Sequence, residues 1–263
     1  MIDSALERAA GFVRRAGTPS EQARLDYLLS GRSLGATVVA VLTGQRADGG
    51  FSPPWSPNYS SIDATCFRLA QAEQAGLHPN QPELSSVVAF LVRRQSCDGS
   101  WEEDVAQAAF APHWAKPGDS MAQAYLTANA GLWVMRGGIH DSAGRAVNFL
   151  NDRLDSDGAI PSFLHANWLA AALFWGMEDR ASAGSVMKYL LRRVSDMSAS
   201  GLAWMVVSLL VSGVAPDHEL ISEARSMLRL NQRDDGAFPS EDGPAHDVYS
   251  TLEAVHALVG QLN

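Results

Sequence analysis

The stretch VLTGQRADGGFSP, residues 41–53, reads as the end of a helix that runs into a tight turn. Two close copies follow, LVRRQSCDGSWEE at 91–103 and LRLNQRDDGAFPS at 228–240. A weaker copy, LDSDGAI at 154–160, has Leu in place of the glutamine and Ile in place of the aromatic residue. The chain therefore repeats a Gln-x-x-Asp-Gly-x-aromatic turn, and such internal repetition indicates a repeat architecture. A degenerate copy of the turn is expected near 190–204, because the gap between the last two copies is about twice the length of a helical hairpin repeat.

The segments on either side of these turns differ in a consistent way. Upstream segments such as 84–95 are amphipathic at helical spacing, whereas downstream segments such as 163–177 and 201–213 are apolar on nearly every side. A helix that is apolar all round is buried all round, so outer and inner helices should alternate. Six outer helices are expected to begin near Asp3, Leu34, Glu83, Ser142, Ser182 and His218, and six inner helices near Ser20, Ser61, Ser120, Phe163, Ala199 and His246. The sequence thus predicts an all-α fold, an α6/α6 toroid that forms one domain over residues 1–263.

The composition narrows the class of protein. The 263 residues are 46% hydrophobic and carry a formal net charge of −9, which disfavours nucleic-acid binding because that depends on basic side chains. No signal peptide opens the sequence, and no apolar run approaches the roughly 18 residues that span a bilayer. The two cysteines, Cys66 and Cys97, form no zinc-binding pattern and fit ordinary thiols. We therefore expect a cytoplasmic protein.

The repeated turn itself has a structural interpretation. Gly49 can supply a left-handed backbone just beyond a helix end, and Asp48 can accept hydrogen bonds from nearby backbone amides. Gln45 can satisfy loose polar groups of the adjoining helix, and Phe51 can wedge against the next pair. These turns are expected to fasten one hairpin to the next and to take no part in chemistry.

The turn, followed by an inner helix of the type HDVYSTLEAVHAL (246–258), resembles the repeat of prenyltransferases and squalene cyclases. The resemblance covers the chain from about Leu34 to the C-terminus and implies an α6/α6 toroid. That superfamily includes class II terpene cyclases, protein prenyltransferase β subunits and complement-like thioester domains. The chain has no Gly-Cys-Gly-Glu-Gln stretch, so its resemblance to the thioester domains extends to the fold and not to their chemistry. At the best match to a prenyltransferase zinc site, 247–249, Tyr replaces the Cys ligand, so no metal site is predicted.

The resemblance to class II cyclases places an acid at the start of an inner helix. These enzymes protonate an alkene or epoxide with an Asp-x-Asp-Asp motif, and the nearest match is SIDAT at 61–65, where Asp63 falls on the middle, proton-donating aspartate. DVYST at 247–251 is a second partial match, with Asp247 on the first aspartate. Both copies lack carboxylates of the motif, and these enzymes usually pair two barrels. Asp63, Asp119 and Asp247 have an alternative interpretation as helix N-caps.

The loops that precede the inner helices are strongly acidic. A diphosphate would need a bridging Mg²⁺ there, whereas a neutral polyene would not. A buried carboxylic acid can stay protonated, and aromatic faces can hold the carbocation that protonation creates. The longest loop, 102–118, is a candidate lid. Aromatic side chains available for such a cavity are Trp55, Tyr59, Trp114, Tyr125, Trp133, Trp168, Trp175, Trp204 and Tyr249.

The leading hypothesis is a small class II terpene cyclase-like enzyme, an isomerase or lyase of natural-product biosynthesis, acting on a hydrophobic isoprenoid or polyene. Asp63 would donate the proton, and His246, Asp247 and Tyr249 would orient it or take the final proton. No cofactor is expected, with Mg²⁺ needed only for a diphosphate substrate. Peripheral membrane contact is compatible with such a substrate. A non-catalytic binding module, or a Mg²⁺-dependent enzyme using Asp234 and Asp235, are the alternatives. Expected substrate contacts are Trp55, Tyr59, Trp114, Asp119, Tyr125, His165, Trp168 and Trp204.

Overall fold

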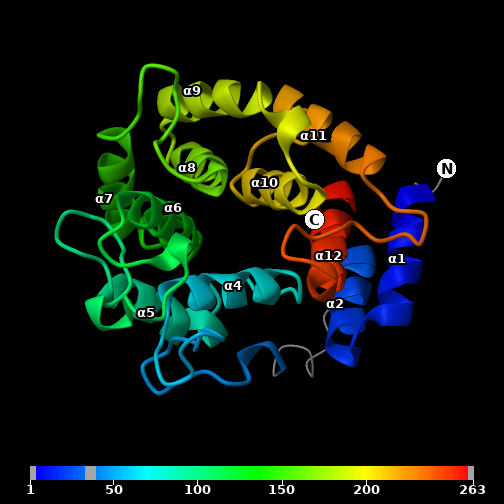
Figure 1. The fold of residues 1–263 in the computed structure, drawn as a ribbon, viewed down its shortest axis with the longest axis horizontal. Helices are drawn as coiled ribbons and strands as arrows, with labels where there is room; N and C mark the ends of the chain where they lie inside the picture. The colour runs from blue at the N-terminus through cyan, green and yellow to red at the C-terminus, as the bar shows by residue number, and fades with distance from the viewer. Residues whose placement is uncertain (1–3, 33–39, 260–263) are drawn as a thin grey trace. The chain divides into compact units, whose positions relative to one another are not determined.

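The computed structural model describes residues 4–32 and 40–259, and this part of the chain is helical, with one isolated bridge between Phe51 and Ser61 as its only β pairing. Figure 1 labels the helices in chain order. Their bounds are α1 Ser4–Ala16, α2 Pro19–Ser30, α4 Ile62–Glu73, α5 Ser85–Arg93, α6 Ser120–Arg136, α7 His140–Asn151, α8 Leu164–Gly176, α9 Arg180–Leu191, α10 Ala199–Val211, α11 Glu219–Leu230 and α12 Asp247–Val259. The prediction of an all-α protein is confirmed.

The helices begin close to the predicted positions. Of the expected outer starts, α5, α7, α9 and α11 begin within two residues of the position expected from the sequence. Asp3 and Leu34, at which two outer helices were expected, lie outside the described residues. Of the helices expected to be inner, α6, α8, α10 and α12 are buried along nearly their whole length, whereas α2 and α4 are buried only in part. In α1, α5, α7 and α11, buried residues are confined to one face.

The Asp-Gly turns have one geometry in three places. The side-chain amide of Gln45, Gln95 or Gln232 donates a hydrogen bond of 3.0 Å to the carbonyl of the glycine four residues later. The backbone amide of the aromatic residue, Phe51, Trp101 or Phe238, donates to a threonine hydroxyl of the following helix at 3.0 to 3.1 Å. In the weaker copy Asn167 accepts from the Ile160 amide in the same way, at 2.8 Å. The turn therefore fixes the register of the helix that follows it.

The glycine of each turn lies against the backbone of another helix. Gly99 has φ +92°, and a Cβ placed on it would lie 2.4 Å from the carbonyl oxygen of Arg145 on α7. Gly236 has the same φ, and its Cβ would lie 2.3 Å from the carbonyl oxygen of Arg8 on α1. Neither the backbone conformation nor the space admits a side chain. The predicted role of these turns as fasteners between hairpins is confirmed.

The chain divides into two compact units. One consists of residues 42–73 and 77–189 and is built around α6, which packs against α4, α5, α7 and α8. The other consists of residues 1–41, 74–76 and 190–263 and is built around α12, which packs against α1, α2 and α10. We call them the α6 unit and the α12 unit. In the α12 unit the last turn contacts the first helix, because Gln232 donates to the carbonyl of Ala5 at 2.9 Å.

Two further sequence expectations concern membranes and thiols. Within the described ranges, every helix is too short or too polar to cross a bilayer. Both cysteines are free thiols; Cys66 is buried on α4, and Cys97 is exposed in the second turn. Burial, followed by the nearby Asp63 and Glu103, raises the pKa of the Cys66 thiol well above its usual range. This thiol therefore stays protonated and packs as a small apolar side chain.

Candidate active site

Asp63 lies in the first turn of α4, in the α6 unit. The helix begins there because Ser61 accepts from the Ala64 amide at 3.1 Å, as an N-cap residue does. The Thr65 hydroxyl donates to the Ser61 carbonyl at 2.6 Å and accepts from the turn amide of Phe51 at 3.1 Å. Asp63 is thus held by the turn that precedes it, while its side chain is left half-buried and is not used to cap its own helix.

The Asp63 carboxyl group accepts one hydrogen bond on each oxygen. The Tyr125 hydroxyl, on α6, donates to Oδ1 at 2.8 Å. The Trp114 indole N–H, from the loop that precedes α6, donates to Oδ2 at 3.2 Å. Donors on both oxygens stabilise the charged form of a carboxyl group, so they also stabilise what remains after a proton is given away.

The direction of the Tyr125 hydrogen bond follows from its neighbours on α6. The indole N–H of Trp133 can only donate, and it binds Oδ1 of Asn129 at 3.1 Å. The Asn129 amide nitrogen therefore faces Tyr125, to whose hydroxyl oxygen it donates at 3.3 Å. Because Tyr125 accepts from Asn129, its own proton is free to point at Asp63. A relay of donors one helical turn apart thus ends at the Asp63 carboxyl group.

Rings surround this carboxyl group. Tyr125 lies edge-on to Phe163 and His165, with ring centroids 6.4 and 6.1 Å apart. His165 lies 5.0 Å from the buried Trp168, and His113 lies 5.1 Å from Trp114. These residues come from α6, from α8 and the residue that precedes it, and from the 102–118 loop, all within the α6 unit. Aromatic faces grouped around an acid suit a cationic intermediate.

The pKa of Asp63 is raised above its usual value. Burial is the largest cause, and it is opposed by the hydrogen bonds from Tyr125 and Trp114 and by a charge on His165. The two influences have different chemical meanings. Burial keeps the proton on the acid, whereas the donors make the carboxylate less costly once the proton has left.

Glu103 caps α4 from another part of the chain, two residues after the aromatic residue of the second turn. It is only 3% exposed, and its oxygens accept from the Ser61 hydroxyl at 2.6 Å and from the amides of Ile62 and Asp63 at 3.1 and 3.2 Å. Tyr59 donates to it at 2.8 Å. Burial raises the pKa of Glu103, and these four donors oppose that rise. The site therefore holds a second carboxyl group, contributed from outside the helix.

The candidate residues share one position in the repeat. Asp63, Tyr125 and Tyr249 each stand two residues before the threonine that binds the turn amide, and His165 stands two residues before Asn167, which replaces that threonine. The turn fixes the threonine or asparagine, so the residue two positions earlier has the same orientation within its own repeat. All four belong to the site predicted from the sequence, where they were selected on other grounds.

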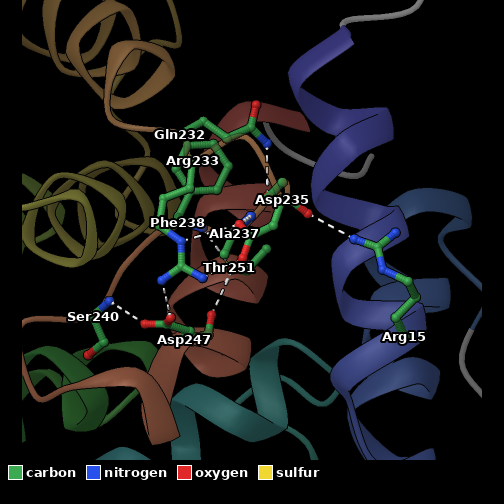
Figure 2. A network of polar contacts seen from close by, with 10 residues as sticks. Arg15, Gln232, Arg233, Asp235, Ala237, Phe238, Ser240, Asp247 and Thr251 are labelled. Atoms are coloured by element: carbon green, nitrogen blue, oxygen red, sulfur yellow. Dashed lines mark hydrogen bonds and ion pairs between the residues drawn. The ribbon is translucent and has the colours of Figure 1, made fainter.

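In the α12 unit, Asp247 is engaged in a structural network, as Figure 2 shows. Its carboxylate accepts from Nη1 of Arg233 at 2.8 Å and from the Ser240 amide at 2.9 Å. Arg233 also pairs with Asp235, whose backbone carbonyl accepts from Arg15 on α1 at 2.8 Å. Asp247 is almost fully buried, so this network fastens the last turn to α12 and α1.

Tyr249, in the same unit, donates to Glu253 one helical turn away at 3.1 Å. Gln74 donates to the same glutamate oxygen at 2.5 Å, and the buried Arg24 donates to Gln74 at 2.8 Å. Burial is the main cause that raises the pKa of Glu253 to about 7, against the opposing effects of Tyr249, Gln74 and Arg24. The second Glu253 carboxyl oxygen is buried and has no hydrogen-bond partner within the described part of the chain.

The other predicted residues have varied surroundings. Asp119 caps α6 by accepting from the amides of Met121 and Ala122, which confirms the capping alternative for this residue. Trp55 lies 6.1 Å from Tyr59, at the Glu103 side of the site. His246 is exposed and Trp204 half-buried, both in the α12 unit. Of the predicted set, the α6 unit therefore brings together Asp63, Trp114, Tyr125, His165, Trp168 and, through Glu103, Tyr59.

Sequence reasoning missed Glu103, Asn129 and Glu253 as site residues. Asn129 and Glu253 carry a signal that could have found them, because each is a polar residue in an apolar helix, four positions after a tyrosine. Glu103 carries no such signal, since it was one of many acidic residues in the loops. Among the described residues there is no group of three or more His, Cys, Asp or Glu placed to hold a metal ion. A cavity of about 400 Å³ in the α6 unit lies between α5 and the 137–139 turn, lined by Val88 and Ile139 among others and not by Asp63.

No family model matches the chain, and no curated protein is found to be similar to it. Solved structures are similar to it over nearly their whole length. The type II terpene cyclase MstE from Scytonema is 15% identical, with 97% of this chain and 96% of that chain covered and a TM-score of 0.63. MstE has been solved in complex with geranylgeranyl dihydroxybenzoate, its substrate, and with merosterolic acid A, its product. A protein from Actinoplanes is 16% identical, with 97% and 98% covered and a TM-score of 0.63. The chain therefore has a fold like that of type II terpene cyclases.

Proposed function

We propose that this protein cyclises a hydrophobic isoprenoid or polyene substrate by acid catalysis, with Asp63 as the acid. The observation that carries the proposal is the state of the Asp63 side chain. It does not cap its own helix, and it accepts from Tyr125 and Trp114 inside a group of aromatic rings. As part of the proposal, the outer and inner helices form the double ring expected from the repeat.

The reaction would begin with transfer of the Asp63 proton to a carbon–carbon double bond. The π electrons form the new C–H bond, and the other alkene carbon becomes a cation. Tyr125 and Trp114 stabilise the carboxylate that is left, and the rings of Phe163, His165 and Trp168 are available to stabilise the cation. Attack by further double bonds closes rings, and loss of a proton from carbon ends the sequence.

The product is then an isomer of the substrate, because one proton is added and one is lost. The fold-related enzyme MstE binds geranylgeranyl dihydroxybenzoate, so a geranylgeranyl chain on a small aromatic acid is the first compound to test. The aromatic rings near Asp63 support a neutral polyene end as the part of the substrate that meets the acid.

Specific contacts disfavour the two alternatives, a non-catalytic binding module and a Mg²⁺-dependent enzyme. A non-catalytic module predicts that Asp63 binds its own helix amides, yet Glu103 and Ser61 fill that role. An enzyme that binds Mg²⁺ through Asp234 and Asp235 needs free carboxylates, yet Asp235 is paired with Arg233 and accepts from the Ala237 amide at 3.0 Å. The acid-catalysed reaction is the function that uses the arrangement best.

The test compares the protein with Asp63→Asn in D₂O, using geranylgeranyl dihydroxybenzoate and simpler polyprenyl compounds. We expect an isomeric product that gains one deuterium, because the proton of Asp63 exchanges with solvent. Asp63→Asn should lower turnover by at least about 100-fold, the lower range for general acid catalysis. The exposed Asp152 on the same unit supplies a matched control, Asp152→Asn. Equal turnover in Asp63→Asn, or a product without deuterium, would refute the assignment.

A further inference from the structure

The protons around Glu103 can be assigned from the donors that face it. Tyr59 accepts from Nη2 of Arg94 at 2.8 Å and from the Asp104 amide at 2.9 Å, and both of these groups can only donate. Its own proton must therefore point to Glu103. Burial, followed by the nearby Glu103, raises the pKa of Tyr59 to about 12, so that proton is retained near neutral pH.

The other three contacts of Glu103 also bring protons toward it. The amides of Ile62 and Asp63 can only donate, and the Ser61 oxygen already accepts from the Ala64 amide. Each Glu103 oxygen thus receives two donors, one hydroxyl and one backbone amide. A carboxylate accepts all four of these bonds, whereas the hydrogen of a protonated carboxyl group could go only to the Ser61 hydroxyl, which would then have to turn its own proton away from Glu103. The geometry therefore fits Glu103 in its charged form.

The charge of Glu103 lies at the N-terminus of α4, beside Asp63. The first turn of a helix favours negative charge, so α4 by itself would favour ionisation of Asp63 and loss of its proton. Glu103 occupies the amides of that turn with a charge of its own. Among the described residues, the titratable groups around Asp63 besides Glu103 are Tyr125 on α6, His165 on α8 and Cys66 on α4, with Arg94 beyond Tyr59. Glu103 differs from them because it is a carboxyl group bound to the amides at the helix start.

We infer that Glu103 is a positioning residue that fixes the first turn of α4 and keeps Asp63 protonated by taking over the anion-binding end of the helix. It supplies, from the next repeat, a carboxylate that the SIDAT segment lacks. The catalytic consequence rests on the proposed function, in which Asp63 is the acid; the effect on Asp63 protonation does not.

The experiment follows Asp63 directly by infrared spectroscopy. The difference spectrum between the protein and Asp63→Asn isolates the carbonyl stretch of the protonated Asp63 carboxyl group, and ¹³C-labelled aspartate confirms it. We expect this band near neutral pH in the unmodified protein. Its titration midpoint should fall by at least about half a pH unit in Glu103→Gln, which removes the charge. In Glu103→Asp, which keeps the charge, the midpoint should stay close to that of the unmodified protein. Asp104→Asn, which removes a charge from the adjacent exposed residue, is the matched control and should leave the midpoint unchanged.

Turnover against pH gives a second measurement. Since the protonated acid is the active form, the rate falls as pH rises through the pKa of Asp63, and this limb should move to lower pH in Glu103→Gln. A midpoint that is unchanged in Glu103→Gln, with the thermal melt intact, would overturn the inference. If Glu103→Gln does not fold, an ionised Asp63 at neutral pH in the unmodified protein would overturn it equally. An infrared shift in a protein without any turnover would support the role of Glu103 and reject the proposed function.

Discussion

Two tyrosine pairs, Tyr125–Asn129 on α6 and Tyr249–Glu253 on α12, have the same spacing and the same place in the repeat. Their hydroxyl protons point in opposite directions. Asn129 donates to Tyr125, which sends its proton outward to Asp63, whereas Glu253 accepts the proton of Tyr249. The repeat fixes where such a side chain lies, and the residue one helical turn later decides whether it can serve a neighbouring acid.

The same contrast applies to the aspartates. Asp63 keeps its carboxyl group for Tyr125 and Trp114, because Glu103 caps its helix. The Asp247 carboxylate instead accepts hydrogen bonds from the Arg233 side chain and the Ser240 amide. Either residue matches part of an acid motif, but only the one whose helix is capped from outside has its carboxyl group outside a salt bridge with the described residues, which supports Asp63 as the acid of the proposed function.

The largest expected effect comes from breaking the turn that both regions share. In Gly99→Ala, the side chain would meet the Arg145 carbonyl at 2.4 Å in a left-handed backbone conformation. We expect a loss of about 2 to 5 kcal/mol in the free energy of unfolding, from backbone strain and crowding together. Gly236→Ala should behave alike, because it meets Arg8 in the same way. Denaturant unfolding measures both.

Gly138→Ala is the control for this experiment. Gly138 has φ +80°, but nothing lies within 4 Å of its Cβ position. Only the backbone strain should remain, about 1 to 2 kcal/mol. Equal losses at Gly99 and Gly138 would show that the close approach of the helices does not matter.

The next effect comes from converting the α6 pair into one like the α12 pair. In Asn129→Asp the new carboxylate accepts from both Trp133 and Tyr125, so Tyr125 turns its proton away from Asp63. Loss of a hydrogen bond to a charged group is worth about 1.5 to 3 kcal/mol, so turnover should fall roughly 10- to 100-fold. Steady-state rates on whichever of the test compounds the unmodified protein converts measure this, at a temperature where thermal melts show the variant folded. The exposed Asn148 on α7 supplies the control Asn148→Asp, and an unchanged rate in Asn129→Asp would contradict the proton direction assigned to Tyr125.

A third effect concerns the dependence of stability on pH in the α12 unit. The pKa of Glu253 rises from 4.5 to about 7 on folding, so this group favours the folded state most below pH 4.5. As the pH rises to about 7 the unfolded chain releases the proton first, and up to about 3 kcal/mol of stability is lost. Glu253→Gln should flatten this part of the curve of unfolding free energy against pH. The exposed Glu223→Gln on α11 should leave the slope as it is, and a slope retained in Glu253→Gln would show that another group titrates.

The sequence determined most of the architecture. The Gln-x-x-Asp-Gly-x-aromatic turn and the apolar inner segments act over short stretches of chain, so local patterns were sufficient to predict where the described helices begin. Asp63 could be selected because SIDAT partly matches the acid motif of class II cyclases, and the turn delivers this segment to a helix start. Trp114 and Tyr125 were among many aromatic residues, and their contact with Asp63 was not visible in any local pattern.

Only the tertiary structure decided how the polar groups are shared. Glu103 caps a helix about forty residues earlier in the chain, Trp133 orients Asn129, and Arg233 occupies Asp247. Each assignment depends on which donors and acceptors come within about 3 Å after packing, and burial makes an unmatched polar group costly. The positions of residues within a helix follow from the local sequence. Which donor binds which acceptor depends on segments that come together only in the folded protein.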